Sequence, residues 1–277
     1  IKFSKNINDL SSAKKFASTF NSNLRSMLVK SNRFALLDRK NSKEVNKELN
    51  LIKGQNVRVE ELAKLGNKVG ADYILIPSLQ KIRNKTIKQK LMGETIKSKE
   101  LSVDLSINII DIATSQIIFS DSMIFSQGGG NLTNFAKKIS NRLSRKITDT
   151  FFPAKLIAFE NNKITVDQGS SFFNKKSKYN IIKLGSRILD QTTKEFSGRV
   201  ENIIGKASFS NGTNKQSILN IDKLTKDKKI LKVDGSIIIR PVFEPLPSAS
   251  DIAKAKIKKI KEKNKKMMKK IDKDKDW

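Results

Sequence analysis

The chain has 277 residues and contains neither cysteine nor histidine. Without cysteine there can be no disulfide, thiolate metal site or nucleophilic thiol. Without histidine, the side chain that most readily transfers protons and binds transition metals near neutral pH is missing. No Gly-rich phosphate loop, Gly-x-Ser-x-Gly elbow or Asp-x-Asp calcium loop occurs either. The sequence therefore predicts that the protein is not an enzyme and holds no metal and no cofactor.

Long apolar runs and acidic residues are also scarce. No run of eighteen apolar residues occurs, so no membrane-spanning helix is predicted. The 27 acidic residues face 56 Lys and Arg, and the resulting net charge of +29 attracts acidic proteins, anionic lipid, lipopolysaccharide or nucleic acid. Aromatic residues make up only 6% of the chain, which leaves no platform for stacking bases. Nucleic acid is therefore the least favoured of these partners.

The apolar spacing in the first third of the chain predicts two pairs of a helix followed by a strand. They are a helix over residues 9–30, a strand over 32–39, a helix over 59–69 and a strand over 73–76. The two strand sequences resemble those of the CsgG/HfaB-like (TolB N-terminal-like) family of bacterial envelope proteins. In that family a helix leads into a "gRFxvldR" strand, here residues 33–39, and a later helix into a "GADYvlxgs" strand, here 70–78. The resemblance implies a mixed sheet covered by helices, and subunits that associate side by side into a ring.

The arm at residues 81–99 corresponds to a hairpin that channel-forming members of the family insert into the outer membrane. Here it carries basic residues throughout: Lys81, Arg83, Lys85, Lys88, Lys90, Lys97 and Lys99. A lysine at the bilayer midplane costs roughly 2–4 kcal/mol, so we do not expect pore activity. The arm is instead expected to face an acidic neighbour or an anionic lipid or lipopolysaccharide surface.

The next segments predict an antiparallel meander followed by a helix. Strict alternation over residues 101–109 predicts a half-buried strand, and 116–125 a further strand after a turn. A helix should begin at Asn131 or Thr133 and end before Pro153. The glycines before it, 128–130, could cradle a phosphate at the helix N-terminus, but a flexible turn is favoured because the Lys and Ser/Thr of a P-loop are missing.

From residue 153 the sequence changes to short alternating runs separated by turn residues, which predict a small all-β module. Asn161 and Asn162 are expected to form a tight hairpin turn. Residues 164–198 are similar to the C-terminal module of the flagellar FlgT family, and the order of the two domains is similar as well. Gln191 and Lys194 depart from the Pro and Gly of that family's turn, but Asp190 can still bond the local backbone.

The C-terminal segment is rich in lysine and follows a proline-containing linker. Ser248 or Ser250 is expected to cap a helix over residues 251–272. Its apolar positions step by four and three residues: Ala253, Ile257, Ile260, Asn264, Met267 and Ile271. This heptad spacing predicts contact with a partner helix, as in a coiled coil. The alternative is a solvated or disordered basic helix.

Together these observations predict an α+β fold: a CsgG/TolB-N-like mixed sheet covered by helices, a small all-β module and a basic C-terminal helix. The expected domains are residues 1–152, 153–243, a linker at 244–250 and a tail at 251–277. The chain begins at Ile1, which suggests a removed signal peptide or a truncation.

The predicted function is that of a non-enzymatic assembly protein of a Gram-negative bacterium, periplasmic or associated with the outer membrane. It would be a ring or scaffold subunit of an envelope machine such as the flagellar basal body, with homo-oligomer and other envelope proteins as partners. Two alternatives stay open. One is a soluble regulator of envelope or peptidoglycan synthesis, similar to the lipoprotein activators of peptidoglycan synthases that share the first fold, and the other is a basic nucleic-acid-binding protein.

Overall fold

The computed structural model divides the chain into two compact units. It describes residues 1–4, 7, 9–37, 71–91, 94–129, 131–175, 177–225, 227–248, 250, 251, 254, 255, 258 and 262, with the backbone alone at 87, 89–91 and 94–98. The sheet unit comprises residues 1–21, 37–137 and 245–277, and the barrel unit comprises 22–36 and 138–244. The predicted division of the chain into domains stays a prediction.

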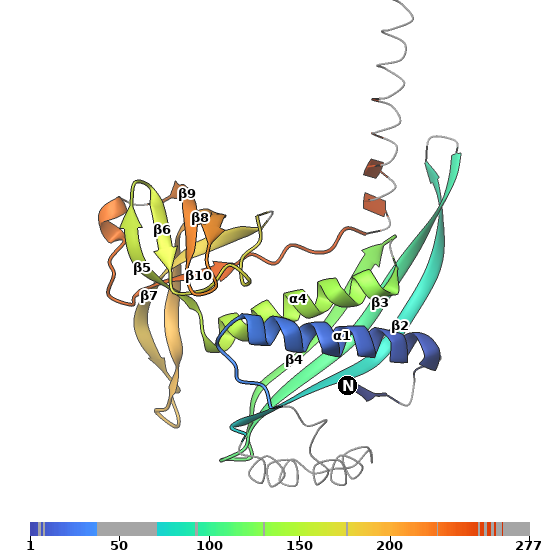
Figure 1. The fold of residues 1–277 in the computed structure, drawn as a ribbon, viewed down its shortest axis with the longest axis horizontal. Coiled ribbons are helices and arrows are strands. Elements are labelled where there is room, and N and C mark those ends of the chain that lie inside the picture. Colours follow the sequence, from blue (N-terminus) through green and yellow to red (C-terminus); the bar gives the residue numbers. More distant parts are fainter. Residues whose placement is uncertain are drawn as a thin grey trace, which may run out of the picture. The chain divides into compact units, whose positions relative to one another are not determined.

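The sheet unit is built on a four-stranded sheet in the order β1-β2-β3-β4. The strands are β1 (Lys2–Phe3), β2 (Tyr73–Leu91), β3 (Glu94–Asp111) and β4 (Ile117–Gly128). The short β1 pairs in parallel with β2, and the other pairs are antiparallel. The parts of α1 (Leu10–Lys30) and α4 (Leu132–Phe151) that belong to this unit lie along one face of the sheet (Figure 1).

The alternation in β3 places one apolar face inward, as predicted. Leu101, Val103, Leu105, Ile107 and Ile109 are each at most 4% exposed. The opposite face carries short polar residues, because serines of β4 stand opposite the intervening residues of β3. These pairs are Ser102 with Ser126, Ser106 with Ser122, and Asn108 with Ser120. The predicted antiparallel meander is therefore confirmed.

Both helices begin where the sequence predicts. The Asp9 carboxylate accepts a hydrogen bond of 2.9 Å from the Ser12 backbone N–H, which satisfies one free donor at the start of α1. Asn131 does the same for α4, because its side-chain oxygen accepts from the Asn134 N–H at 2.8 Å. On α1, Phe16 and Phe20 are fully buried and their rings stack at 5.7 Å.

The strand predicted over residues 32–39 is wrong for the part that the structure describes. Residues 34–37 form no strand, and Leu36 and Leu37 are 37% and 46% exposed. Asn32 adopts a left-handed conformation after α1, with φ of 54°. The next residue, Arg33, bonds to Asp167 and Gln168 of the barrel unit, so contacts with residues remote in sequence hold the chain where it leaves α1. The helix predicted over 59–69 lies outside the described residues.

The barrel unit contains a closed barrel of six strands in the order β10-β5-β6-β9-β8-β7. The strands are β5 (Ala154–Glu160), β6 (Lys163–Val166), β7 (Lys178–Leu189), β8 (Phe196–Gly212), β9 (Ser217–Leu224) and β10 (Ile237–Pro241), with a 3₁₀ turn, η1 (Lys228–Ile230), before the last. The barrel closes because β10 pairs with both β5 and β7. Its core includes Tyr179, Ile181, Ala207, Leu219, Ile237 and Ile239, each fully buried. The predicted hairpin turn is confirmed, since Asn161 and Asn162 both have positive φ, at 48° and 63°.

The predicted fold class requires correction. A mixed sheet covered by helices was expected, but the described residues contain only two α-helices and the structure is mostly β. The two helices cover the apolar face of β3 that carries Leu101 to Ile109, whereas Ile74, Ile110 and Ile112 form a separate, smaller buried cluster. The second module needs no helix over its core, because closing the barrel buries the apolar side of every strand.

The β3–β4 and β7–β8 turns have the same hydrogen-bonding pattern and backbone conformation. The Asp111 carboxylate accepts from the Thr114 N–H at 2.9 Å, and the Asp190 carboxylate accepts from Thr192 and Thr193 at 2.8 Å each. Four residues after each Asp, a non-glycine residue is left-handed: Ser115 with φ of 60° and Lys194 with φ of 59°. The turn that Asp190 was predicted to stabilise is therefore formed, with the non-glycine residue Lys194 at its left-handed position.

Candidate interaction surfaces

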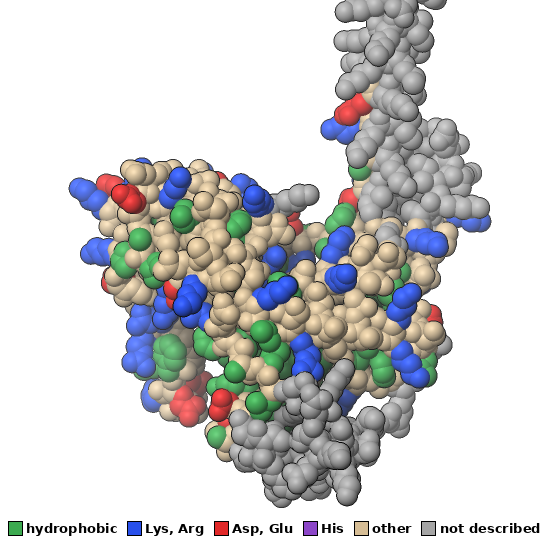
Figure 2. Space-filling view, viewed as in Figure 1, with side chains coloured by type: hydrophobic (Ala, Val, Ile, Leu, Met, Phe, Trp, Pro, Cys, Tyr) green, Lys and Arg blue, Asp and Glu red, His purple; other side chains and the backbone are tan. Residues whose placement is uncertain are grey.

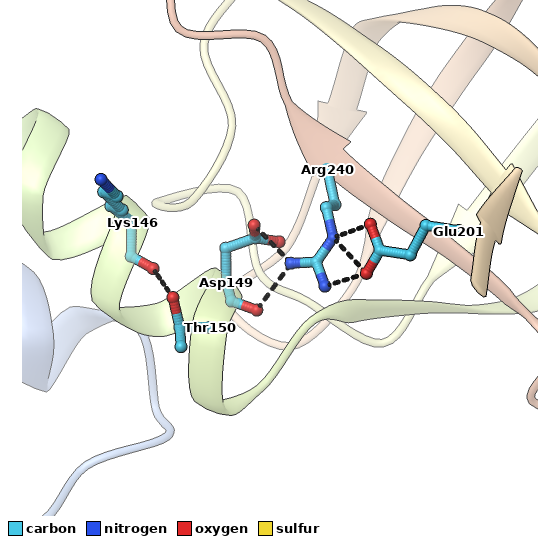
Figure 3. Close-up of polar contacts among 5 residues, drawn as sticks. All are labelled: Lys146, Asp149, Thr150, Glu201 and Arg240. Atoms are coloured by element: carbon cyan, nitrogen blue, oxygen red, sulfur yellow. Dashed lines mark hydrogen bonds and ion pairs between the residues drawn. The ribbon is translucent and has the colours of Figure 1, made fainter. Parts of the chain in front are cut away.

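A cluster of charged residues joins the end of α4 to the barrel (Figure 3). The Arg240 guanidinium donates to Asp149 Oδ2 at 2.7 Å and to Glu201 Oε1 at 2.6 Å. It also donates to the Asp149 backbone carbonyl at 3.2 Å. Because one arginine of β10 binds both α4 and β8, the cluster fixes three elements of the barrel unit together.

Burial raises the pKa of Asp149 to about 6, although Arg240 acts in the opposite direction. The side chain of Asp149 is only 11% exposed, and its Oδ1 is buried without a hydrogen-bond partner. Protonation of this carboxyl would therefore remove an incompletely paired buried charge. Sequence reasoning missed the cluster, because its members are separated by up to 91 residues.

A second arginine, Arg142 on α4, joins this helix to the residues that follow β10. Arg142 donates to the backbone carbonyls of Glu244 at 2.6 Å and Phe243 at 3.1 Å. Its guanidinium also lies 5.2 Å from the centre of the Phe243 ring. From the other direction, Arg33 after α1 pairs with Asp167 at 3.0 Å and donates to Gln168 at 3.0 Å. These polar groups are occupied in holding the barrel unit together.

Glycines 128 and 129 do not offer free amides to a phosphate. The Gly128 N–H donates to the Pro247 carbonyl at 2.9 Å, and the Gly129 N–H donates to the Lys99 carbonyl at 2.7 Å. Gly129 has φ of 66°, which explains the glycine at this turn. Nor does the part of the chain that the structure describes bring together three acidic residues that could hold a metal ion.

We use the name basic arm for residues 85–99, the outer part of the β2–β3 hairpin and most of the arm predicted at residues 81–99. All its strand pairs lie within the hairpin, because the pairing of β3 with β4 ends at Glu100, and only the Lys99 carbonyl at its base accepts from Gly129 outside it in the described residues. In the backbone register, Lys88 stands opposite Lys97.

The structure places the seven predicted basic residues in different settings. Lys81, Lys85, Lys88 and Lys99 are exposed, whereas the structure gives only the backbone at Lys90 and Lys97. Arg83 is occupied within the sheet, since it pairs with Asp104 at 3.3 Å. A register shift between Leu79 and Lys81 precedes this pair and determines which residues of β3 the following basic residues face.

The predicted tail interface, Ala253, Ile257, Ile260, Asn264, Met267 and Ile271, lies outside the described residues. The start of the segment is described, and Ser248 caps it. The Ser248 N–H donates to the Asp251 carboxylate at 3.0 Å, and the Asp251 N–H donates to Ser248 Oγ at 3.1 Å. This reciprocal pair is a capping arrangement that favours a helix start. None of the described helices is long and apolar enough to span a membrane.

Sequence reasoning missed the β7–β8 ribbon, which we define as residues 185–203 of the hairpin. The sequence predicted short alternating runs in this region and not one long hairpin. In the structure these residues form strand pairs only within the β7–β8 hairpin and none with β10 or β9. Figure 1 shows β7 and β8 continuing past the other strands of the barrel. The apolar residues placed symmetrically about Asp190–Glu195 were the available signal.

Comparison with known proteins gives one family match. Residues 10–124 match the model of a family described as peptidoglycan-synthase activator LpoB. This is less than half of the chain, and it covers α1 and most of the sheet. A search of the curated proteins finds no match. The match favours the predicted alternative, a regulator of peptidoglycan synthesis, over a flagellar ring subunit.

Two solved structures are similar over part of the chain. The lipoprotein GNA1162 from Neisseria meningitidis is 14% identical, with a TM-score of 0.35, over 54% of this chain and 95% of its own. The hypothetical protein CT253 from Chlamydia trachomatis is 16% identical, with a TM-score of 0.32, over 48% of this chain and 81% of its own. None of these findings supports the CsgG or FlgT resemblance in particular, or a ring.

Proposed function

We propose that this protein is a non-enzymatic regulator in the bacterial envelope that activates a peptidoglycan synthase by binding it. The match of residues 10–124 to the LpoB family carries the proposal. The absence of cysteine and histidine supports a role that depends on surfaces rather than on catalysis. We place the protein in the periplasm of a Gram-negative bacterium, where such a synthase works, with association to the outer membrane as a further possibility.

The basic arm is our first contact surface for the synthase. Lys85, Lys88 and Lys99 are exposed there, and the arm pairs with no other strand. Clustered positive charge accelerates association with an acidic surface and makes it dependent on salt.

The test measures glycan polymerisation and cross-linking by the purified peptidoglycan synthase of the same genome, with and without this chain. We expect the chain to raise at least one of the two rates and to have no such activity alone. Replacing Lys85, Lys88 and Lys99 by Gln should weaken activation at low concentration of the chain. The matched control replaces the exposed barrel residues Lys163, Lys215 and Lys229 by Gln, which changes the charge equally. A synthase whose rates do not respond to the unmodified chain would refute the proposal.

A further inference from the structure

The β7–β8 ribbon exposes more large apolar side chains than any other element in the described part of the chain. They are Ile188, Leu189, Phe196, Val200 and Ile203, which are between 42% and 57% exposed. Burying apolar surface is the main favourable term in protein association, at about 25 cal/mol per Å². Figure 2 shows hydrophobic and basic side chains side by side in this part of the barrel unit. The concentration of exposed apolar residues on one projecting hairpin indicates a contact surface.

These side chains occupy both faces of the ribbon. Leu189 stands directly opposite Phe196, and Ile188 stands opposite Gly198. Because neighbouring residues of a strand point to opposite faces, Leu189 and Ile188 lie on different faces. A two-stranded hairpin with no third strand is only marginally stable in water. A partner that covers both faces, as a groove does, would suit the ribbon better than a flat surface.

Two arginines of the ribbon favour a partner that carries negative charge. Arg187 stands directly opposite Arg199, an arrangement that is unfavourable because like charges repel across strands. Neither of them forms an ion pair with a carboxylate of the described chain. The Arg187 guanidinium lies 4.9 Å from the centre of the Phe196 ring, so the positive charge adjoins the apolar pair. A carboxylate brought by the partner could bind both guanidinium groups.

We propose that the β7–β8 ribbon inserts into a groove of an acidic partner protein, with apolar walls against both faces and a carboxylate at Arg187 and Arg199. A lipid bilayer fits less well, because Asp190 and Glu195 lie at the turn and would enter it first. A second copy of this chain is disfavoured by the net charge of +29. The inference rests on the proposed function for the partner, the peptidoglycan synthase. It goes beyond the family match, which ends at residue 124.

The experiment measures binding of the full chain to the immobilised periplasmic region of the synthase. Replacing Leu189 and Phe196 together by Ser should weaken binding at least about tenfold. Replacing Arg187 and Arg199 together by Gln should weaken it about fivefold and make it less sensitive to salt. The controls are Val233→Ser, at an equally exposed apolar position (59%) of the barrel unit, and the pair Lys215→Gln with Lys229→Gln. The controls should bind as the unmodified chain does.

The results distinguish failure of the proposed function from failure of the inference about the ribbon. If the unmodified chain does not bind the synthase, the proposed function and this inference both fail. If it binds, and the ribbon variants bind equally well, only the inference fails. Loss of binding to phosphatidylglycerol vesicles, with synthase binding kept, would assign the ribbon to a membrane and overturn the inference. Circular dichroism melts check folding, and if the Ser variant melts early, the single Arg199→Glu change at an exposed side chain carries the test.

Discussion

The basic arm and the β7–β8 ribbon are both outer parts of long hairpins that pair only with themselves, yet they differ in chemistry. In the ribbon, Arg187 stands opposite Arg199, so two like charges face each other across the strands. The arm is rich in lysine, whereas the ribbon adds exposed apolar side chains. The arm is thus suited to long-range attraction, and the ribbon to a tight contact at short range.

The bases of the two hairpins differ as well. The base of the arm carries a partly exposed ion pair, Arg83 with Asp104, at 3.3 Å. The ribbon is anchored by Arg240, which binds Glu201 at 2.6 Å and the buried Asp149 at 2.7 Å. A rigid base helps the ribbon more than the arm. The ribbon must keep its orientation in a tight contact, whereas the arm acts through its charge at longer range.

The largest difference should appear when these anchors are removed. Arg240→Gln should lower the free energy of unfolding by about 2–4 kcal/mol at pH 7, because it leaves a buried carboxylate without its partner. Arg83→Gln should cost less, about 1 kcal/mol, because both side chains of its pair are partly exposed, at 34% and 22%. Urea unfolding measures both. Equal losses in the two variants would show that the bases are anchored equally well.

The second prediction concerns the pH dependence of the ribbon's base. Burial raises the pKa of Asp149 from 3.8 to about 6, so the folded protein favours the protonated carboxyl. This contribution to stability is complete below about pH 4 and is lost as the pH rises through about 6. The stability of the unmodified chain relative to Asp149→Asn should therefore fall by about 1–3 kcal/mol between these values. Urea unfolding at a series of pH values provides the measurement, and a difference that does not change with pH would contradict it.

The third prediction separates the two surfaces by salt. Raising NaCl from about 50 to about 300 mM should weaken synthase binding by about tenfold in the unmodified chain, because the Debye length shortens. The chain with Lys85, Lys88 and Lys99 replaced by Gln should lose clearly less over the same range. The Leu189→Ser and Phe196→Ser variant should keep the salt dependence of the unmodified chain. If the arm variant is as sensitive to salt as the unmodified chain, the arm does not supply the attraction.

The smallest effect is expected at the two shared turns. Ser115 and Lys194 both hold left-handed backbone conformations, which glycine adopts without a steric penalty. Ser115→Gly and Lys194→Gly should each raise the free energy of unfolding by about 0.5–1 kcal/mol, read from thermal melts. Thr114→Gly, one residue before the left-handed position, is the control and should destabilise. A loss of stability in both designed variants would show that these turns are not strained.

Local patterns in the sequence were sufficient for much of the fold. Asp9 and the apolar stripe of α1, the alternation of β3 and the Asn161–Asn162 turn all act over a few residues, so each could be predicted. The exposed lysines of the arm could be predicted in the same way. Their charge needs water or a partner whichever way the chain folds.

Only the tertiary structure decided the features that join distant residues. Arg33 bonds to Gln168, 135 residues away, and residues 34–37 form no strand despite their apolar sequence. Pairing of β10 with both β5 and β7 closes the barrel, and no local pattern contains that choice. The buried Asp149, with its raised pKa, and the length of the β7–β8 ribbon also depend on which strands and helices become neighbours. Periodicity and turn chemistry are local energies, whereas closure, burial and ion pairing arise only once the chain has brought remote segments together.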